Sequence, residues 1–150
     1  MTEALEGTRK PYDTYPIRVD TRGRIATPPT YKETFRDGVV ISPGLGNRCL
    51  LIMNLTRWRE TMEGLVEEML SKRLLGRNRI ERLLYGRTYD NQLDSQGRLL
   101  LRPSHRTYAD LSINSRGVIV GVDSHLEAWS LTEWVKHTNK INDSVREDRI

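Results

Sequence analysis

The chain has 150 residues, which suits one compact domain or two very small ones, and its 37% hydrophobic content allows only a modest core. Charged residues make up 29% of the chain and the net charge is +4, which excludes wholesale disorder and a polycationic tail. No apolar run approaches the roughly 18 residues that span a bilayer, and residues 1–10 lack the apolar core of a signal peptide. We therefore expect a soluble, cytosolic protein without a membrane partner.

The reactive side chains are few and scattered. The single Cys49 cannot form an internal disulfide and is expected in the core, because a lone cysteine usually acts as a small apolar residue. The three histidines, His105, His125 and His137, show no metal-ligand spacing and have no nucleophile or carboxylate at a recognisable motif spacing. We expect His105 at a surface position of a helix. The sequence therefore predicts no metal, no cofactor and no small-molecule substrate, and a protein that is not an enzyme.

The basic charge is concentrated in two stretches. Residues 8–36 sum to +4 and residues 70–106 sum to +6, while the rest of the chain sums to −6. This distribution suits the binding of a polyanion on particular faces of the molecule. A solvated helix face is the alternative, above all for residues 72–87, where basic and apolar residues interleave as in any amphipathic helix.

An internal repeat divides the chain into two halves. The sequence DTRGR at residues 20–24 recurs as DSQGR at residues 94–98, displaced by 74 residues without a gap. In this register Lys32 falls on Arg106. Each half predicts a strand, a tight turn, a strand, a short helix, a β-hairpin and a helix. Because units of this size cannot bury their own faces, we expect them to pair into one pseudo-symmetric α+β domain.

In the first half, the apolar stretches at residues 38–41 and 49–53 predict the two strands of the hairpin. Asn54, three residues before Arg57, predicts the N-cap of the helix that follows.

The segment between the repeats is helical in pattern from Thr56 to Tyr85, with a break at Gly76 and a stop at Gly86. Four apolar residues recur at helical spacing in this segment: Leu65, Met69, Leu74 and Leu75. They predict a packing surface for neighbouring subunits.

In the second half, residues 117–120 and 126–129 predict the equivalent hairpin. Ser130 with Glu133 forms a capping-box pattern that opens the last helix, and residues 142–150 predict a frayed, polar tail without a function. All three tryptophans are expected in the core: Trp58, Trp129 and Trp134.

The repeated Asp-x-x-Gly-Arg has a clear physical role in a turn. The glycine supplies the positive φ that a tight turn needs, and the aspartate accepts hydrogen bonds from the turn amides, which fixes the direction of the arginine. In a purely structural alternative, the arginine pairs with a neighbouring carboxylate. Because the motif is duplicated and both copies lie in the basic stretches, we favour a paired role in contacting an anion.

These residues resemble the MraZ family, bacterial transcriptional regulators encoded at the head of division and cell-wall gene clusters. The resemblance covers roughly residues 12–140, and its most specific element is the doubled Asp-x-x-x-Arg. Three further stretches are family-like: HRTYADL at residues 105–111, VIVG at residues 118–121 and EAW at residues 127–129. Two departures concern the turns: Arg102 stands where the family usually has proline, with Pro103 one residue late, and Arg22 stands where lysine is more usual.

The resemblance implies an α+β fold in which two pseudo-symmetric SpoVT-AbrB-like halves form a double-split β-barrel with accessory helices. Residues 12–60 would form the first half, residues 61–87 the inter-repeat helices and residues 88–140 the second half. The termini, residues 1–11 and 141–150, would be flexible.

The resemblance also assigns roles in contacting DNA. Arg24 and Arg98 would be the principal contacts, Arg22 and Gln96 the flanking contacts, and Asp20, Gly23, Asp94 and Gly97 the residues that shape and orient the turns. Nearby Lys32, Arg102 and Arg106 suit sequence-independent phosphate contacts. An arginine can bond bidentately to guanine O6 and N7, which is worth about 1–3 kcal/mol of discrimination.

The function implied is that of a cytoplasmic, nucleoid-associated transcriptional regulator. It would bind direct repeats in promoter DNA of a division and cell-wall gene cluster as a ring-shaped homo-oligomer, gaining avidity from several repeats. The alternative is a ring-forming assembly protein or an antitoxin-like protein-binding module without specific DNA binding. Salt dependence separates the two, because a complex with several phosphate contacts weakens steeply with salt.

Overall fold

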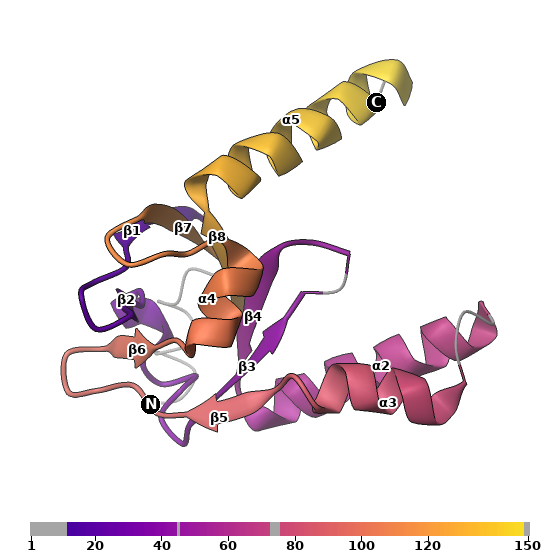
Figure 1. The fold of residues 1–150 in the computed structure, drawn as a ribbon, viewed down its shortest axis with the longest axis horizontal. Helices are drawn as coiled ribbons and strands as arrows, with labels where there is room; N and C mark the ends of the chain where they lie inside the picture. The colour runs from indigo at the N-terminus through magenta and orange to yellow at the C-terminus, as the bar shows by residue number, and fades with distance from the viewer. Residues whose placement is uncertain (1–11, 45, 73–75, 149–150) are drawn as a thin grey trace.

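The computed structural model describes residues 12–44, 46–72 and 76–148 and has a mixed α+β fold (Figure 1). The first half contains β1 (Thr14–Arg18), β2 (Arg24–Ala26), the 3-10 helix η1 (Pro29–Tyr31), β3 (Val39–Pro43), β4 (Cys49–Met53) and α2 (Leu55–Ser71). There follow α3 (Arg77–Tyr85), β5 (Tyr89–Asn91), β6 (Arg98–Leu100), α4 (Pro103–Ala109), β7 (Arg116–Val122), β8 (His125–Ser130) and α5 (Leu131–Asp148). The predicted order of elements is confirmed in both halves. Several predictions fall outside the described residues: those on residues 1–11, Arg73, Leu74, Leu75, Arg149 and Ile150.

The two halves exchange strands. Six strands form an antiparallel sheet in the order β1-β7-β8-β4-β3-β5, and β2 pairs with β6 in a separate two-stranded ribbon. The first strand of each half pairs with the hairpin of the other: β1 with β7, and β5 with β3. The two hairpins meet in the middle of the sheet, where Cys49 of β4 faces Trp129 of β8. Neither half therefore completes its own sheet, although the described strands show no closed barrel and the double-split barrel stays a prediction.

The main core is one cluster of buried side chains from both halves. The first half contributes, among others, Val19, Ile25, Tyr31, Ile41 and Leu50, and the second half contributes Leu99, Leu101, Leu111, Ile119 and Leu126. Cys49 is buried as predicted, and burial raises the pKa of its thiol to about 12, which makes it unreactive at neutral pH. Trp129 is also buried, whereas Trp134 is only partly buried and packs edge-on against it with ring centroids 5.6 Å apart.

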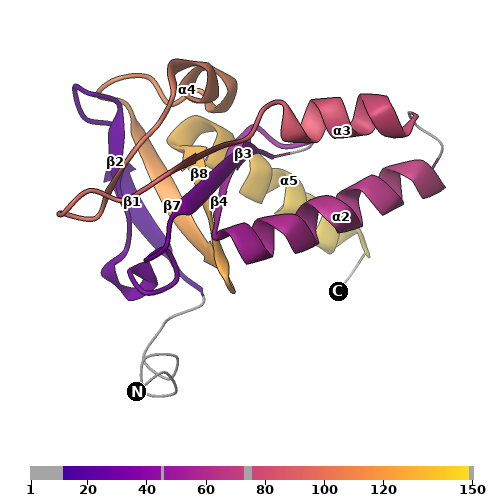
Figure 2. The ribbon, with the colours of Figure 1, turned by 90° about the horizontal axis from the view of Figure 1, so that it is seen from below.

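Helices α2 and α3 lie side by side and extend from the sheet (Figure 2). They share a second cluster of buried residues, namely Met62, Val66, Ile80 and Leu84, with Trp58 partly buried against it. Asn54 accepts a hydrogen bond from the Arg57 N–H at 2.8 Å, and Gly76 and Gly86 flank α3 as the pattern predicts. Leu65 and Met69 pack against this cluster, so the α2–α3 contact already uses part of the apolar surface predicted for neighbouring subunits.

The last helix is longer than the sequence pattern predicts. The Ser130 hydroxyl caps it by accepting the Glu133 N–H at 3.1 Å, as expected. The helix then continues to Asp148 through the stretch predicted as a frayed tail, and it extends away from the strands (Figure 1). Local bonds support this polar end, since Ser144 donates to the Lys140 carbonyl and Arg146 pairs with Asp143. No helix in the described ranges is long and apolar enough to cross a membrane.

The prediction that His105 lies at a surface position is wrong. Its residue surface is 6% exposed, because the histidine lies on the inner side of α4 with its ring 4.8 Å from that of Tyr89. Its Nε2 bonds to the Arg87 carbonyl at 2.6 Å. Burial lowers the pKa of His105, so the neutral imidazole is favoured.

The Arg102 departure leaves the backbone unchanged. Pro28 has φ −63° and ψ 133°, and Arg102, at the same place in the second half, has φ −65° and ψ 147°. Both residues precede a proline, Pro29 or Pro103, and a residue before proline is confined to extended conformations. Each proline then occupies the first turn of its short helix.

Candidate nucleic-acid interface

The two Asp-x-x-Gly-Arg segments form the same turn. In the first, the Gly23 N–H donates to the Asp20 carbonyl at 3.0 Å and the Asp20 N–H donates to the Arg24 carbonyl at 2.9 Å. The second turn repeats both bonds at the same distances between its own residues. Gly23 has φ +81° and Gly97 has φ +75°, so both glycines take the positive φ that the motif predicts.

The aspartate of each turn organises the side of the loop that carries the arginine. Oδ1 of Asp20 accepts the N–H groups of Arg22 and Arg24, each at 2.9 Å, and its Oδ2 accepts Nε–H of Arg24 at 2.8 Å. Asp94 repeats the pattern with three bonds of 2.9 Å from the corresponding residues, Gln96 and Arg98. These bonds lower the pKa of both carboxyls. The largest cause is the backbone N–H of Arg24 for Asp20 and that of Arg98 for Asp94.

Strands β2 and β6 carry the arginines on one face of the ribbon. Arg24 lies opposite Leu100 and Ala26 lies opposite Arg98, while the middle pair, Ile25 and Leu99, is buried in the core. Because side chains alternate between the faces of a strand, the arginines lie on the outward face. The apolar middle pair therefore fixes the ribbon to the body and turns both arginines outward.

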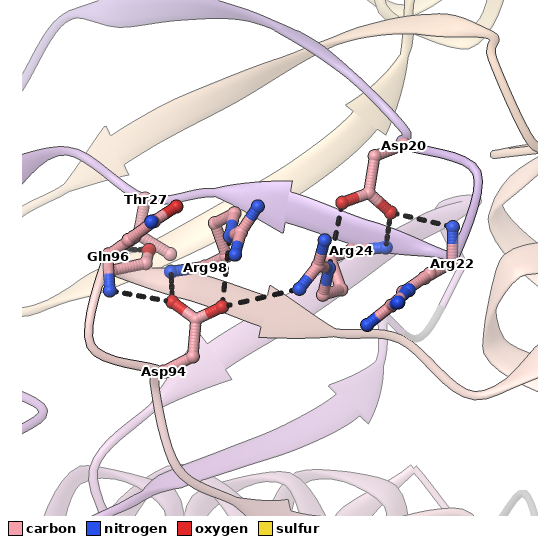
Figure 3. A network of polar contacts seen from close by, with 8 residues as sticks. Asp20, Arg22, Arg24, Thr27, Asp94, Gln96 and Arg98 are labelled. Carbon is pink, nitrogen blue, oxygen red and sulfur yellow. Dashed lines mark hydrogen bonds and ion pairs between the residues drawn. The ribbon is translucent and has the colours of Figure 1, made fainter.

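The two arginines meet at a single carboxylate. Oδ2 of Asp94 lies 2.9 Å from Nε of Arg98 and 3.7 Å from Nη1 of Arg24, although the two arginines are 74 residues apart in sequence (Figure 3). Thr27 secures the far end of β2 by donating its hydroxyl to the Gly97 carbonyl at 2.8 Å. The network is therefore a joint product of both halves.

This arrangement orients the arginines and leaves donors available. The structural alternative is realised, because each arginine pairs with the aspartate of its own turn. Those pairs use Nε, however, and within the described residues the Nη atoms of Arg98 make no hydrogen bond to protein. The Arg24 and Arg98 side chains remain 23% and 33% exposed. A guanidinium held from its Nε side can present its free N–H groups to a planar acceptor pair.

The other predicted DNA-contacting residues lie around this network. Lys32 is exposed directly after η1, and Arg106 is partly buried on α4, with Nε 3.0 Å from where a Cβ on Gly23 would stand. Arg102 is exposed as well and lies over the ring of Tyr89, with its guanidinium carbon 4.1 Å from the ring centroid. The structure thus brings Arg106 to the first turn and places Arg102 on an aromatic neighbour.

Two cavities flank the ribbon and the sheet. One of about 490 Å³ lies beside the second turn and is lined by Lys32, Phe35 and residues 92–97, among others. A larger one, of about 830 Å³, lies between β5 and the start of α2. None of the predicted site residues lines the larger cavity. The candidate site therefore lies at the ribbon and its two turns. Within the described ranges, no three metal-ligating side chains gather into a cluster.

Sequence reasoning missed the apolar neighbours of the arginines. Ala26 and Leu100 share the outward face of the ribbon with Arg24 and Arg98, and Leu100 is 49% exposed. The signal was present, since residues two apart in a strand point to the same side. A leucine run at positions 99–101 instead reads as uniformly buried.

The fold and site define a pseudo-symmetric α+β protein of two strand-exchanged halves that presents paired arginines on a two-stranded ribbon. The sequence of residues 84–149 matches the model of a family described as "MraZ protein, putative antitoxin-like". Relatives named "Transcriptional regulator MraZ" include one from Coxiella burnetii, 38% identical over 123 residues, covering 79% of this chain and 78% of the relative. Another, from Shewanella sediminis, is 32% identical over 136 residues, covering 88% and 87%. A third, from Thermus thermophilus, is 29% identical over 131 residues, covering 87% and 89%. The chain belongs to the MraZ family of transcriptional regulators.

Proposed function

We propose that this protein is a sequence-specific DNA-binding regulator that binds direct repeats in the promoter of a division and cell-wall gene cluster. It acts on double-stranded DNA in the bacterial cytoplasm, associated with the nucleoid, and it carries out no catalysis. The observation that carries the proposal is the convergence of Arg24 and Arg98 on Asp94 at the outward face of the ribbon.

The shape of the ribbon supports readout from the major groove. The major groove of B-DNA admits a two-stranded β-ribbon, and guanine presents O6 and N7 there as a pair of acceptors. Arg24 and Arg98 each approach such a pair with Nε already held by an aspartate, so less freedom is lost on binding. Arg22 and Gln96 lie at the equivalent exposed position of each turn and serve as flanking contacts.

Phosphate contacts come from the basic residues around the ribbon. Lys32, Arg102 and Arg106 follow the two turns in sequence and occupy the short helices or the residues next to them. Such contacts place the protein on the duplex without reading sequence. Each makes the slope of log affinity against log salt more negative by about 0.9.

The protein assembles into a closed ring, with each chain folded as a double-split barrel. The strand exchange between β1–β7 and β5–β3 supports the barrel, because it interlocks the halves as in a swapped hairpin. Along the extended α5, four apolar residues remain exposed, namely Leu131, Val135, Ile141 and Val145. A neighbouring copy that covers them removes this apolar surface from water. Light scattering at micromolar concentration then gives a mass several times 17.4 kDa, and a monomer contradicts the ring.

Fluorescence anisotropy on a duplex from immediately upstream of the protein's own gene tests the DNA proposal. The expected result is binding that exceeds binding to scrambled DNA and weakens steeply across a salt series. Arg24→Ala and Arg98→Ala each weaken upstream binding by about 1–3 kcal/mol, with fold and assembly intact. Lys32→Ala and Arg106→Ala weaken both duplexes alike and lower the salt slope by about 1 each.

Arg146→Ala is the charge-matched control. Arg146 lies near the end of α5, which extends away from the strands (Figure 1), and its side chain is 83% exposed. Because α5 also carries the apolar residues proposed for the ring, light scattering first checks that this variant keeps the mass of the parent, and it then binds like the parent. If Arg24→Ala and Arg98→Ala also bind like the parent, the assignment of the ribbon as the contact surface is wrong.

The protein-binding alternative makes a different prediction in the same assay. The family description includes the words "antitoxin-like", which is the observation that favours a protein partner as the alternative. A protein-binding module without specific DNA recognition binds upstream and scrambled duplexes equally.

A further inference from the structure

We propose that Leu100 reads a thymine, by packing against the 5-methyl group of the base beside the guanine that Arg24 contacts. This inference rests on the proposed function and deepens it, because it names a second base and the residue that selects it. The observation behind it is an exposed leucine directly across the ribbon from one arginine and an alanine across from the other.

The register puts the two side chains in contact range of one another. Leu101 N–H donates to the Gly23 carbonyl and Thr27 N–H donates to the Gly97 carbonyl, each near 3.0 Å, so these are the hydrogen-bonded rungs of the ribbon. Alternation then makes Arg24 and Leu100 a non-hydrogen-bonded pair, the type in which facing side chains lie closest. Facing Cβ atoms in such pairs are about 4.5–5.5 Å apart.

Leu100 is exposed, although both of its neighbours in the sequence are buried leucines. Its neighbours Leu99 and Leu101 are fully buried, whereas Leu100 remains 49% exposed on the face that carries the arginines. Its backbone is also held in place, because its carbonyl accepts the Tyr89 hydroxyl at 2.8 Å and the Asn91 amide at 3.3 Å. Leu100 is therefore an apolar side chain carried on a well-bonded backbone at the outward face.

The chemistry of the major groove supplies a matching target. Thymine alone among the four bases places a methyl group there, and apolar side chains recognise it by contact. A residue beside Arg24 that is too apolar to bond guanine or phosphate fits this group. Ala26 holds the equivalent place opposite Arg98 and carries only a single methyl. The apolar surface beside the arginine is therefore larger at Arg24, where leucine stands, than at Arg98, where alanine stands.

Replacing thymine with uracil tests the inference, because this change removes only the 5-methyl group. Each thymine of the upstream duplex is replaced by deoxyuridine, one position of the repeat at a time, and affinity is measured by anisotropy. For the parent protein, one position weakens binding about fourfold, the value of burying a single methyl group. Leu100→Ala loses about the same affinity on unmodified DNA and no longer distinguishes thymine from uracil at that position.

Ala26→Leu is the matched gain-of-contact variant. It places a leucine opposite Arg98, where the parent has none, and it creates a second position that is sensitive to the methyl group. The inference is overturned if no position responds to uracil in the parent, or if Leu100→Ala keeps the same response. It is also overturned if Leu100→Ala changes the mass in light scattering, since Leu100 then belongs to an assembly contact.

Failure of the proposed function gives a different result. In that case the parent protein binds upstream and scrambled duplexes equally, and the inference falls with it. If upstream binding is specific and depends on Arg24 but ignores the thymine methyl groups, only the role of Leu100 is wrong.

Discussion

The two Asp-x-x-Gly-Arg turns share every backbone bond and differ in what lies beside them. Around Gly23, the Arg106 guanidinium fills the space next to the turn, with Nε 3.0 Å from a Cβ position. Around Gly97, the nearest atom to the equivalent position is the Thr27 hydroxyl at 3.8 Å, and Lys32 lines a cavity of about 490 Å³. The repeat thus reproduces the loop, while the basic residue that follows the turn of the other half, Arg106 or Lys32, determines how closely the loop is packed.

The aspartates differ as well. Asp20 accepts one arginine side chain, that of Arg24, whereas Asp94 contacts both Arg24 and Arg98. Asp94 therefore couples the halves. The second turn has looser packing beside its glycine than the first turn, while its aspartate contacts one arginine more. Local sequence similarity does not make two sites equivalent when their neighbours come from different elements.

The largest loss of stability is expected at the buried middle residues of the ribbon, which the two halves have in common. Ile25→Ala and Leu99→Ala each remove a fully buried side chain from the inner face of the ribbon, so each lowers the free energy of unfolding by about 2–5 kcal/mol. Urea unfolding at a fixed protein concentration measures both. A loss below about 1 kcal/mol for either variant would show that this half of the ribbon is not anchored by its middle residue.

Substitution of the turn glycines should cost different amounts of stability in the two turns. Gly23→Ala and Gly97→Ala each force alanine into a left-handed conformation, at a cost of about 1–2 kcal/mol. Gly23→Ala costs more, because its Cβ also displaces Arg106, and this excess disappears in an Arg106→Ala background. Gly64→Ala, in the open middle of α2, is the control and stabilises the protein by up to about 1 kcal/mol. Equal costs at Gly23 and Gly97 would contradict the tighter support of the first turn.

The sequence predicts the local features of this molecule well. The turn glycines have positive φ, the aspartates accept the turn amides, and Asn54 and Ser130 cap their helices, all of which follows from short-range chemistry. These features depend on residues within four positions of each other. Periodicity also places α2 and α3, with their boundary at Gly76.

What the sequence pattern could not predict depends on long-range contacts. His105 has the polarity of a surface residue, yet Tyr89 and the Arg87 carbonyl bury it. The sharing of Asp94 depends on the pairing of β2 with β6, which joins residues 74 positions apart. Leu100 is exposed only because this pairing assigns Leu99 to the core. A one-residue change of register would reverse that assignment.

A smaller effect distinguishes the short helices that follow the turns. In the repeat register, His105 corresponds to Tyr31, so only the second half has a histidine at this buried place. Burial, followed by the charge of Arg102, lowers the pKa of His105 below its ordinary value of 6.5. The unfolded chain then takes up a proton near pH 6.5 that the folded protein resists, so stability is full above this pH and falls as the pH drops.

Thermal unfolding from pH 8 to pH 5 measures this dependence. The parent loses stability below pH 6.5, whereas His105→Gln, which keeps a donor for the Arg87 carbonyl, shows a flatter profile. A profile for His105→Gln as steep as that of the parent would assign the acid sensitivity to other groups.

The smallest effect compares the aspartates. Asp20→Asn and Asp94→Asn keep an oxygen for the turn amides and lose the ion pairs to arginine. The pKa of each carboxyl is lowered from its ordinary 3.8, so the stabilisation is present above this pH and is lost as the pH falls through the folded value. The difference in unfolding temperature between parent and variant should therefore vanish in strong acid. Salt also lowers this difference in unfolding temperature, because these pairs are partly exposed.

At neutral pH, Asp94→Asn should destabilise the protein more than Asp20→Asn, since Asp94 contacts two arginines and Asp20 contacts one. The reverse order would mean that the 3.7 Å contact between Arg24 and Asp94 contributes nothing to joining the two halves.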